Sequence, residues 1–489
     1  MGELERLATR CILPGFEGPV VPGWVRRRLA DGLGGVVLYA WNVESRDQLR
    51  ALTADLRSER DDVLVAIDEE GGDVTRLEAG TGSSYPGSGA LGVVDDLELT
   101  ERVATSLGAE LGDAGVTLDF APVADVNTNP QNPVIGIRAF GDDGALVARH
   151  VAAFVRGLQG TGVAACAKHF PGHGDTSVDS HLALSTVDSI DEVALEPFRA
   201  AIGADVQSIM TAHIVVRSLG ESPATMSREI LHDLLRDELG FGGLVVTDAL
   251  EMKAISATVG EEEGAVRAIA AGADALCLGH DLFDDSVGTV RDALVAAVRD
   301  GRLGEERLVE AAARVAALAA WSAAHRTAAR VDHDAGRVAA RRALRVEGDL
   351  RPDRPPLVVE LEPETGMAAG RLSQLPGEWF QAVVPEADVV RFGAGPVDVD
   401  LPPLNGRQLV VIARDAHRHA WERDAIDALT ARVPGTIVVE IGVPHWRPPA
   451  AAAFLATYGA ARVNVESAAE WLYSRERRGV EQSGSSPGS

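Results

Sequence analysis

The sequence predicts an α/β fold: a (β/α)8 TIM-like barrel followed by a smaller three-layer α/β sandwich domain. Between residues 11 and 325, eight short apolar runs alternate with longer segments of helical period, and such alternation is typical of parallel βαβ units. Several runs also lack polar alternation, as expected of strands that are covered on both faces. The second domain follows from the length, because 489 residues exceed what one barrel requires.

Each predicted strand is a short run of mostly apolar or β-branched residues. The strands are expected within residues 11–15, 35–40, 63–68, 116–123, 163–170, 208–216, 244–250 and 275–279. The intervening helices are expected at residues 25–31, 45–59, 99–114, 144–159, 190–202, 227–238, 261–271 and 285–300. Eight such units in about 310 residues are what a barrel requires. A doubly wound open sheet is the alternative that this pattern leaves open.

The chain is predicted to divide into four parts. The barrel is assigned to residues 1–325 and ends in an Ala-rich helix at residues 302–324. A helical, Pro-rich linker follows at residues 326–355. Strand-like and helical runs alternate again in residues 356–478, the predicted C-terminal α/β domain, and the Gly/Ser-rich tail at residues 479–489 is expected to be disordered.

The charge and composition exclude several classes of protein. Lys and Arg number 46 against 73 Asp and Glu, so the net charge is −27, which argues against nucleic-acid binding and against docking on anionic lipid. There is no apolar run long enough for a membrane span and no apolar signal segment at the N-terminus. The three cysteines are far apart, which disfavours a zinc ribbon, a redox pair or a disulfide framework. We therefore expect a cytoplasmic protein without nucleic-acid or membrane partners, and the oligomeric state is left open.

Polar residues at the ends of the apolar runs are the candidates for chemistry, because the active sites of barrels form at the carboxyl ends of the strands. Asp68 ends the third run, and Arg76 follows in the same loop. After the fourth run, Asp125 is a candidate to orient an Arg or Lys side chain, with a backbone-satisfied structural Asp as the alternative, and Arg138 follows. Asp248 ends the seventh run, where a carboxylate held by cationic side chains would stay ionised and serve as a nucleophile.

The densest polar stretch follows the fifth run and reads KHFPGHGDTSVDSH at residues 168–181. Lys168 and His169 can donate to substrate hydroxyls or carbonyls. Asp179 can accept from one ring nitrogen of His181 and leave the other for proton transfer. His213, after the sixth run, offers a further imidazole, with a structural histidine as the alternative. A metal site is the alternative for the long stretch, and its candidate ligands are His169, His173, Asp175 and His181.

Four motifs together resemble glycoside hydrolase family 3, specifically its two-domain β-N-acetylglucosaminidase branch. KHFPGHGDTSVDSH is similar to the signature of that branch, and LLRDELGFGGLVVTDALEM (234–252) to the nucleophile segment of the family. AIDEEGGDVTRL (66–77) and FAPVADVN (120–127) are similar to two sugar-binding strand ends. The motifs stand in the family order across the predicted barrel. The resemblance implies a retaining exo-β-N-acetylglucosaminidase that acts on peptidoglycan or chitin fragments and needs no metal or other cofactor.

The resemblance also implies roles for particular residues. Asp248 would be the nucleophile that forms a covalent glycosyl-enzyme. His181, paired with Asp179, would be the general acid/base in place of the usual carboxylic acid. The side chains that would contact the sugar, the last near its reacting face, are Asp68, Arg76, Arg138, Lys168, His169 and His213.

Three departures from the family pattern concern the substrate more than the fold. Ala249 replaces a frequent second Asp, Glu251 stands where a small residue is commoner, and the Arg138 loop reads IGIRAF. The alternatives are therefore a phosphorylase that uses phosphate as acceptor, because a histidine acid/base adds no second negative charge beside Asp248, and a β-glucosidase. A catalytically inactive sugar-binding protein is the alternative from another functional class. In each case the expected partner is a small carbohydrate.

Overall fold

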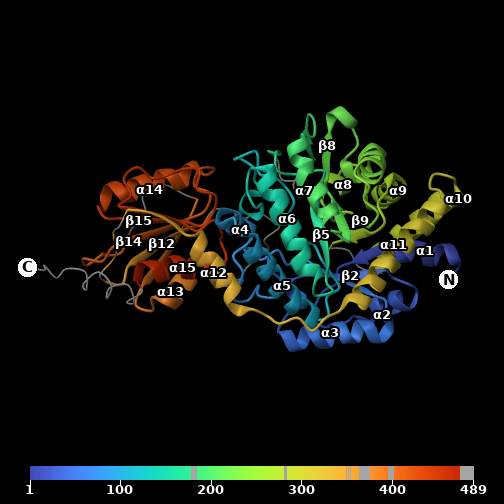
Figure 1. Ribbon diagram of the computed structural model, residues 1–489, viewed down its shortest axis with the longest axis horizontal. Coiled ribbons are helices and arrows are strands. Elements are labelled where there is room, and N and C mark those ends of the chain that lie inside the picture. The colour runs from blue at the N-terminus through green and yellow to red at the C-terminus, as the bar shows by residue number, and fades with distance from the viewer. Residues whose placement is uncertain are drawn as a thin grey trace, which may run out of the picture.

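The computed structural model describes residues 1–177, 184–279, 284–348, 350, 352, 354–362, 375–394 and 401–473. The predicted tail at residues 479–489 and the predicted pair of Asp179 and His181 lie outside the described residues. Two α/β units lie side by side, with the N-terminal unit coloured blue to yellow and the C-terminal unit orange to red in Figure 1.

The N-terminal unit is a barrel of parallel strands, and each of the eight predicted runs contains one of them. The strands are β1 (Ile12–Pro14), β2 (Gly35–Leu38), β3 (Leu64–Ile67), β4 (Leu118–Asp119), β5 (Ala164–Phe170), β7 (Ser208–Thr211), β9 (Leu244–Val246) and β10 (Leu276–Leu278). Hydrogen-bonded ladders join β2, β3, β4, β5, β7 and β9 in that order, and β1 pairs with β10. A bridge between Val246 and Ala275 connects the two sets. The predicted fold class is confirmed, and the open-sheet alternative is not.

Alternation along the strands builds the barrel interior. One buried cluster contains inward-pointing residues from all eight strands, including Leu13, Val37, Leu118, Cys166 and Met210. The intervening residues, such as Val36 and Val65, belong to a second cluster that faces the surrounding helices. A strand places successive side chains on opposite faces, so runs that are apolar throughout fill both the interior and the outer layer.

Helices cover the outside of the barrel. They are α1 (Glu3–Arg10), α2 (Gly23–Ala30), α3 (Arg46–Glu59), α4 (Ser88–Val94), α5 (Leu97–Asp113), α6 (Gly144–Gln159), α7 (Glu192–Gly203), a π-helical segment (Glu229–Glu238), α8 (Lys253–Ser256), α9 (Glu261–Ala271), α10 (Asp284–Arg299) and α11 (Glu305–His325). Ser45, Asp96 and Asp143 begin α3, α5 and α6, and the side chain of each accepts a hydrogen bond from the backbone amide three residues on. Such caps satisfy amides that have no partner within the helix. At the rim, β6 (Ser185–Val187) pairs with β8 (Ile214–Val216).

The C-terminal unit is a three-layer sandwich. Its sheet has the order β11 (Arg345–Glu347), β16 (Ala453–Ala456), β15 (Ile437–Glu440), β14 (Leu409–Ala413), β12 (Leu357–Glu362) and β13 (Asp388–Gly393), and β11 is antiparallel to its neighbour. Helices α13 (Pro376–Val383) and α15 (Arg462–Tyr473) pack on one face of the sheet, and α14 (Ala420–Arg432) on the other. Thus β11, which lies in the stretch predicted as a linker, is an edge strand of this sheet.

The two units are in direct contact. Helix α12 (His333–Ala343) packs between α4 and α5 of the barrel and α15 of the sandwich (Figure 1). Ile137, from a barrel loop, is buried in the same cluster as Trp379 of α13. Among the described residues, we find no helix that is both long and apolar enough to span a membrane.

Candidate active site

Six of the predicted site residues lie at or after the carboxyl ends of barrel strands. Asp68 comes directly after β3, with Arg76 in the same loop, and Lys168 and His169 lie near the end of β5. Arg138 lies in the loop after β4, and Asp248 comes two residues after β9. Because the strands are parallel, all these ends meet at one end of the barrel.

Lys168 joins two carboxylates at the centre of this end. Its Nζ lies 2.6 Å from Oδ1 of Asp68 and 2.7 Å from Oε1 of Glu70, and its side chain is only 2% exposed. Burial disfavours an ammonium group, but the charges of Asp68 and Glu70 outweigh it and raise the pKa of Lys168. Arg76 approaches the other oxygen of Asp68, with Nη2 3.8 Å from Oδ2. Lys168 therefore remains a cation that can donate hydrogen bonds.

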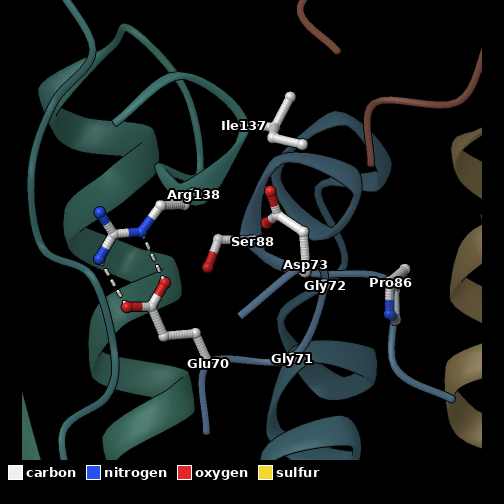
Figure 2. A pocket seen from close by; sticks show the side chains of 9 residues that line it. Glu70, Gly71, Gly72, Asp73, Pro86, Ser88, Ile137 and Arg138 are labelled. Carbon is white, nitrogen blue, oxygen red and sulfur yellow. Dashed lines mark hydrogen bonds and ion pairs between the residues drawn. The ribbon is translucent and has the colours of Figure 1, made fainter. Parts of the chain in front are cut away.

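Glu70 links Lys168 to Arg138. The guanidinium of Arg138 donates from Nε (2.9 Å) and Nη2 (2.7 Å) to the two oxygens of Glu70, a bidentate geometry that Figure 2 shows. Burial opposes ionisation of Glu70, yet Arg138 and Lys168 hold its pKa well below its usual range. Sequence reasoning did not select Glu70. A signal was present, since three cations predicted for one buried site require more carboxylates than Asp68 and Asp248 supply.

Asp125 fixes the orientation of the His169 ring. After β4 the chain runs alongside β5, and the amide of Ala124 donates to the carbonyl oxygen of Lys168 at 2.6 Å. Oδ2 of Asp125 accepts a hydrogen bond from Nδ1 of His169 at 2.8 Å, and Oδ1 accepts from the amide of His173 at 2.6 Å. A carboxylate can only accept here, so the hydrogen sits on Nδ1 and the ring orientation is set. The hydrogen-bond partners of Asp125 are thus a histidine and backbone amides, not the Arg or Lys considered from the sequence.

The two described histidines that were considered as metal ligands, His169 and His173, already have protein partners. His173 is buried, and Thr176 Oγ1 lies 2.7 Å from its Nδ1. Burial lowers the pKa of His173 to about 4, so its ring is neutral near pH 7. Among the described residues, the one group with ligand spacing for a metal is His232, Asp233 and Asp237, on the π-helical segment outside the barrel. His181, the fourth candidate ligand, lies outside the described residues.

Asp248 and the residues after it form the opposite side of the site. Oδ1 of Asp248 accepts from the amide of Ala249 at 2.8 Å. His213 is fully buried, its Nε2 donates to the carbonyl oxygen of Ala249 at 3.0 Å, and its Nδ1 lies 2.8 Å from Thr225 Oγ1. These contacts favour a positioning role for His213 over the sugar contact expected from the sequence. Its ring supports the backbone that follows Asp248.

Glu251 is a second carboxyl group on this side, and no Arg, Lys or His among the described residues forms an ion pair with it. Its Oε2 accepts from the amide of Gly279 at 2.8 Å. Burial, with the charge of Asp248 adding to it, raises the pKa of Glu251 to about 7. Glu251 departs from the family pattern in the sequence, but the pattern alone predicts no function for it.

A family model described as the glycosyl hydrolase family 3 N terminal domain matches residues 25–318, which is most of the barrel. The chain belongs to glycosyl hydrolase family 3. The resemblance inferred from the four motifs is thereby confirmed, and the strand-end residues described above belong to a family 3 barrel.

Two relatives match between 58% and 67% of this chain. A beta-hexosaminidase A from Pseudoalteromonas piscicida is 37% identical over 321 residues, which are 58% of this chain and 53% of that relative. A beta-N-acetylglucosaminidase/beta-glucosidase from Cellulomonas fimi is 34% identical over 343 residues, which are 67% of this chain and 59% of the relative. The chain therefore spans only somewhat more than half the length of these two relatives.

A solved structure is similar over both units. It is a family 3 β-N-acetylglucosaminidase from Paenibacillus sp., with a TM-score of 0.85 and 33% identity, and the match covers 96% of this chain and 97% of that one. The barrel followed by a sandwich is thus an arrangement that this family 3 chain shares with a solved family 3 structure.

Proposed function

We propose that this family 3 protein is a retaining exo-β-N-acetylglucosaminidase that removes terminal GlcNAc from peptidoglycan or chitin fragments. The observation that carries the proposal is the linked set of Asp68, Lys168, Glu70 and Arg138 at the same barrel end as Asp248. The similarity to the Paenibacillus β-N-acetylglucosaminidase over both units supports the choice of sugar. So do the names of the hexosaminidase relatives.

Sugar binding in this proposal uses groups of fixed charge and direction. Asp68 accepts hydrogen bonds from hydroxyl groups, and Lys168, Arg76 and Arg138 donate to hydroxyl oxygens. His169 is held by Asp125 at Nδ1, so Nε2 is the ring atom that it can turn toward the sugar. Because the carboxylates and cations hold one another before the sugar arrives, little reorganisation is needed on binding.

Hydrolysis proceeds in two displacements. The carboxylate of Asp248 attacks the anomeric carbon, and the bond to the leaving oxygen breaks as His181 donates its proton to that oxygen. Water then attacks the same carbon, His181 takes the water's proton, and Asp248 is released as a carboxylate. Asp179 accepts from the other ring nitrogen of His181 and stabilises the imidazolium. The roles of His181 and Asp179 rest on the sequence.

The test is turnover by the purified full chain. Release of 4-nitrophenol from the β-GlcNAc glycoside is compared with release from the β-glucoside. The Asp248→Ala variant is expected to lose at least about 10³-fold in kcat, because it removes the nucleophile. Asp233→Ala, which changes an exposed carboxylate on the outside of the barrel, serves as control and should match the wild type. Near wild-type turnover by Asp248→Ala would contradict the proposal. Faster turnover of the glucoside would mean that the substrate sugar is glucose and not GlcNAc.

Water is the acceptor that the charges favour. The cations Lys168, Arg138 and Arg76 are matched by the carboxylates Asp68, Glu70 and Asp248 at this end of the barrel. A phosphorylase would have to hold a phosphate dianion there in addition. Phosphate is tested in the same assay: we expect GlcNAc as the product with or without it, and GlcNAc-1-phosphate would establish the phosphorylase instead.

A further inference from the structure

The turn that presents Glu70 is built around two glycines. Gly71 and Gly72 both have positive φ (73° and 68°), and a Cβ on Gly72 would lie 3.0 Å from Cα of Gly87. Glycine loses more conformational freedom on ordering than any other residue. Backbone bonds restrain the turn, since the amide of Glu70 donates to the carbonyl oxygen of Val74 at 3.1 Å. Neither glycine can add a side-chain contact, so Asp73 is the next residue that can anchor the turn.

Asp73 is anchored by the C-terminal unit. Its Oδ2 accepts a hydrogen bond from Nη2 of Arg414, and the side chain of Asp73 is only 6% exposed. Arg414 directly follows β14, at the carboxyl end of the sheet. The Figure 2 view places Asp73 across a small pocket from the Glu70–Arg138 pair, with Ser88 between them.

The backbone beside Arg414 is held in place by buried carboxyl groups. Oε1 of Glu440 accepts from the amide of Asp415 at 2.7 Å, and Oδ1 of Asp415 accepts from the amide of Val443 at 2.8 Å. The amide of Arg414 donates to Oε2 of Glu422 at 3.2 Å. Arg414 therefore extends from a fixed base toward the barrel.

The other side of the Glu70–Arg138 pair is also held by the C-terminal unit. Ile137, next to Arg138, is buried in the core cluster of that unit. His417 donates from Nε2 to the carbonyl oxygen of Pro130 at 2.7 Å, in the same barrel loop. Both segments that carry the ion pair thus contact the sandwich.

We propose that Arg414 is a positioning residue through which the C-terminal unit holds the sugar-binding charges of the barrel. By fixing Asp73, Arg414 fixes the turn that carries Glu70, and Glu70 in turn places Arg138 and Lys168. Arg414 itself contacts Asp73, which is not one of these sugar-binding residues. The inference rests on the proposed function for its kinetic readout, because Arg138 and Lys168, which Glu70 places, are there assigned to the sugar.

The test compares full-length Arg414→Gln and Arg414→Lys variants with the wild type. Substrate is the 4-nitrophenyl β-GlcNAc glycoside, and free GlcNAc is the competitive inhibitor. Arg414→Gln is expected to raise both KM and the inhibition constant of GlcNAc by about fivefold to tenfold, the range of indirect coupling between residues. Arg414→Lys keeps a charge for Asp73 and should restore most of the affinity. Asp73→Asn is measured as well. The double variant Asp73→Asn/Arg414→Gln should bind GlcNAc no more weakly than the worse of the two single variants, because both changes remove the same contact.

Arg462→Gln is the matched control. Arg462 also joins the two units, donating to Ser84 Oγ at 2.7 Å and to the carbonyl oxygen of Gly82 at 3.1 Å, but it does not touch Asp73. Its KM and inhibition constant should stay within about twofold of the wild type. Equal effects of Arg462→Gln and Arg414→Gln would reduce Arg414 to a general docking contact and overturn the inference, as would unchanged constants in Arg414→Gln.

Hydrogen exchange gives a readout that does not depend on the substrate. The amides of residues 70–76 should exchange faster in Arg414→Gln than in the wild type or in Arg462→Gln. If the wild type fails to turn over GlcNAc glycosides, the proposed function falls, while the exchange rates still decide whether Arg414 positions the turn. Unchanged exchange at residues 70–76 would overturn the positioning role.

Discussion

At the residue scale, buried carboxyl groups in this barrel fall into two kinds. Glu70 faces Arg138 and Lys168, which hold its pKa low. Glu69, one residue earlier, accepts from neutral groups, the amides of Arg76 (2.8 Å) and Leu77 (2.9 Å), and burial raises its pKa to about 7. Neighbouring positions in the chain thus carry opposite protonation tendencies, because successive side chains meet different partners. Glu70 is suited to hold cations, and Glu69 to shape the loop of Arg76.

Glu251 yields a pH prediction. Its pKa is raised from 4.5 to about 7, so between these pH values the folded chain keeps a proton that the unfolded chain has released. The free energy of unfolding therefore falls as pH rises from about 4.5 to 7, and the loss is complete above 7. In Glu251→Gln the side-chain amide cannot ionise, and its oxygen can still accept the hydrogen bond from the amide of Gly279. We expect this variant to be more stable than the wild type by about 3 kcal/mol at pH 8 and equal to it near pH 4.5.

Urea denaturation of both proteins at pH 5, 6.5 and 8 measures this difference. Glu238→Gln, on the exposed face of the π-helical segment, is the control and should follow the wild type at every pH. A constant gap between Glu251→Gln and the wild type across the series would mean that Glu251 does not titrate in this range.

The candidate site was predictable where a residue's place on a strand is enough. Asp68, Lys168 and Asp248 end apolar runs, and the ends of parallel strands must converge. Glu70 and Asp125 escaped correct assignment because their roles depend on partners from other strands: Glu70 meets Arg138 68 positions away, and Asp125 meets His169 44 positions away. A pattern within one segment contains no information about such pairings.

At the element scale, periodicity predicted the eight helices that alternate with the strands to within a few residues, but it missed α1, α4 and α8, and several strands are shorter than the apolar runs that contain them. The run at 116–123 yields only β4, Leu118–Asp119. Beyond it the chain continues along β5, where the amide of Cys166 donates to the carbonyl oxygen of Ala121 at 2.8 Å. This path brings Asp125 to His169. The apolar residues at the end of the run therefore position a site residue and do not extend the strand.

The loop after β5 gives an element-scale prediction. A Cβ on Gly174 would overlap the carbonyl oxygen of Val126, which lies directly after Asp125. Gly174→Ala must therefore push the loop away from the segment that anchors His169 and His173. We expect a loss of about 1–3 kcal/mol in stability and of roughly 10²-fold in kcat/KM for the aryl glycoside. Thermal denaturation and steady-state kinetics measure the two effects.

Gly203→Ala is the matched control for Gly174→Ala. Gly203 ends α7, and a Cβ there would meet no atom within 4 Å. Alanine has a higher helix propensity than glycine, so the stability of this variant should be unchanged or slightly higher, and its activity should equal that of the wild type. If Gly174→Ala behaved like Gly203→Ala, the close approach of the loop to Val126 would have no functional importance.

At the scale of the whole molecule, the sequence predicted two units but not how they meet. Arg414 and Asp73 are 341 positions apart, and neither lies in a motif that would mark it as an interface residue. The two surfaces instead fit through shape and buried charge: Trp379 packs against Gly82, and Ile137 enters the sandwich core. Such complementarity becomes visible only when both units are folded.

The contact between Gly82 and Trp379 leads to a prediction for unfolding. With Ile137 and Trp379 in one buried cluster, we expect the wild type to unfold in a single cooperative calorimetric transition. Gly82 has φ +81°, and a Cβ there would overlap the ring of Trp379 and lie 2.9 Å from Cβ of Arg462. Gly82→Ala must therefore separate α13 from the barrel, and the transition should split in two.

Gly240→Ala, with φ +71° but no atom within 4 Å of its Cβ, carries the same backbone strain without the clash. It should lower the melting temperature and keep one transition. A single transition in Gly82→Ala would show that the sandwich stays coupled to the barrel without this contact, and that the remaining contacts between the units suffice to hold them together.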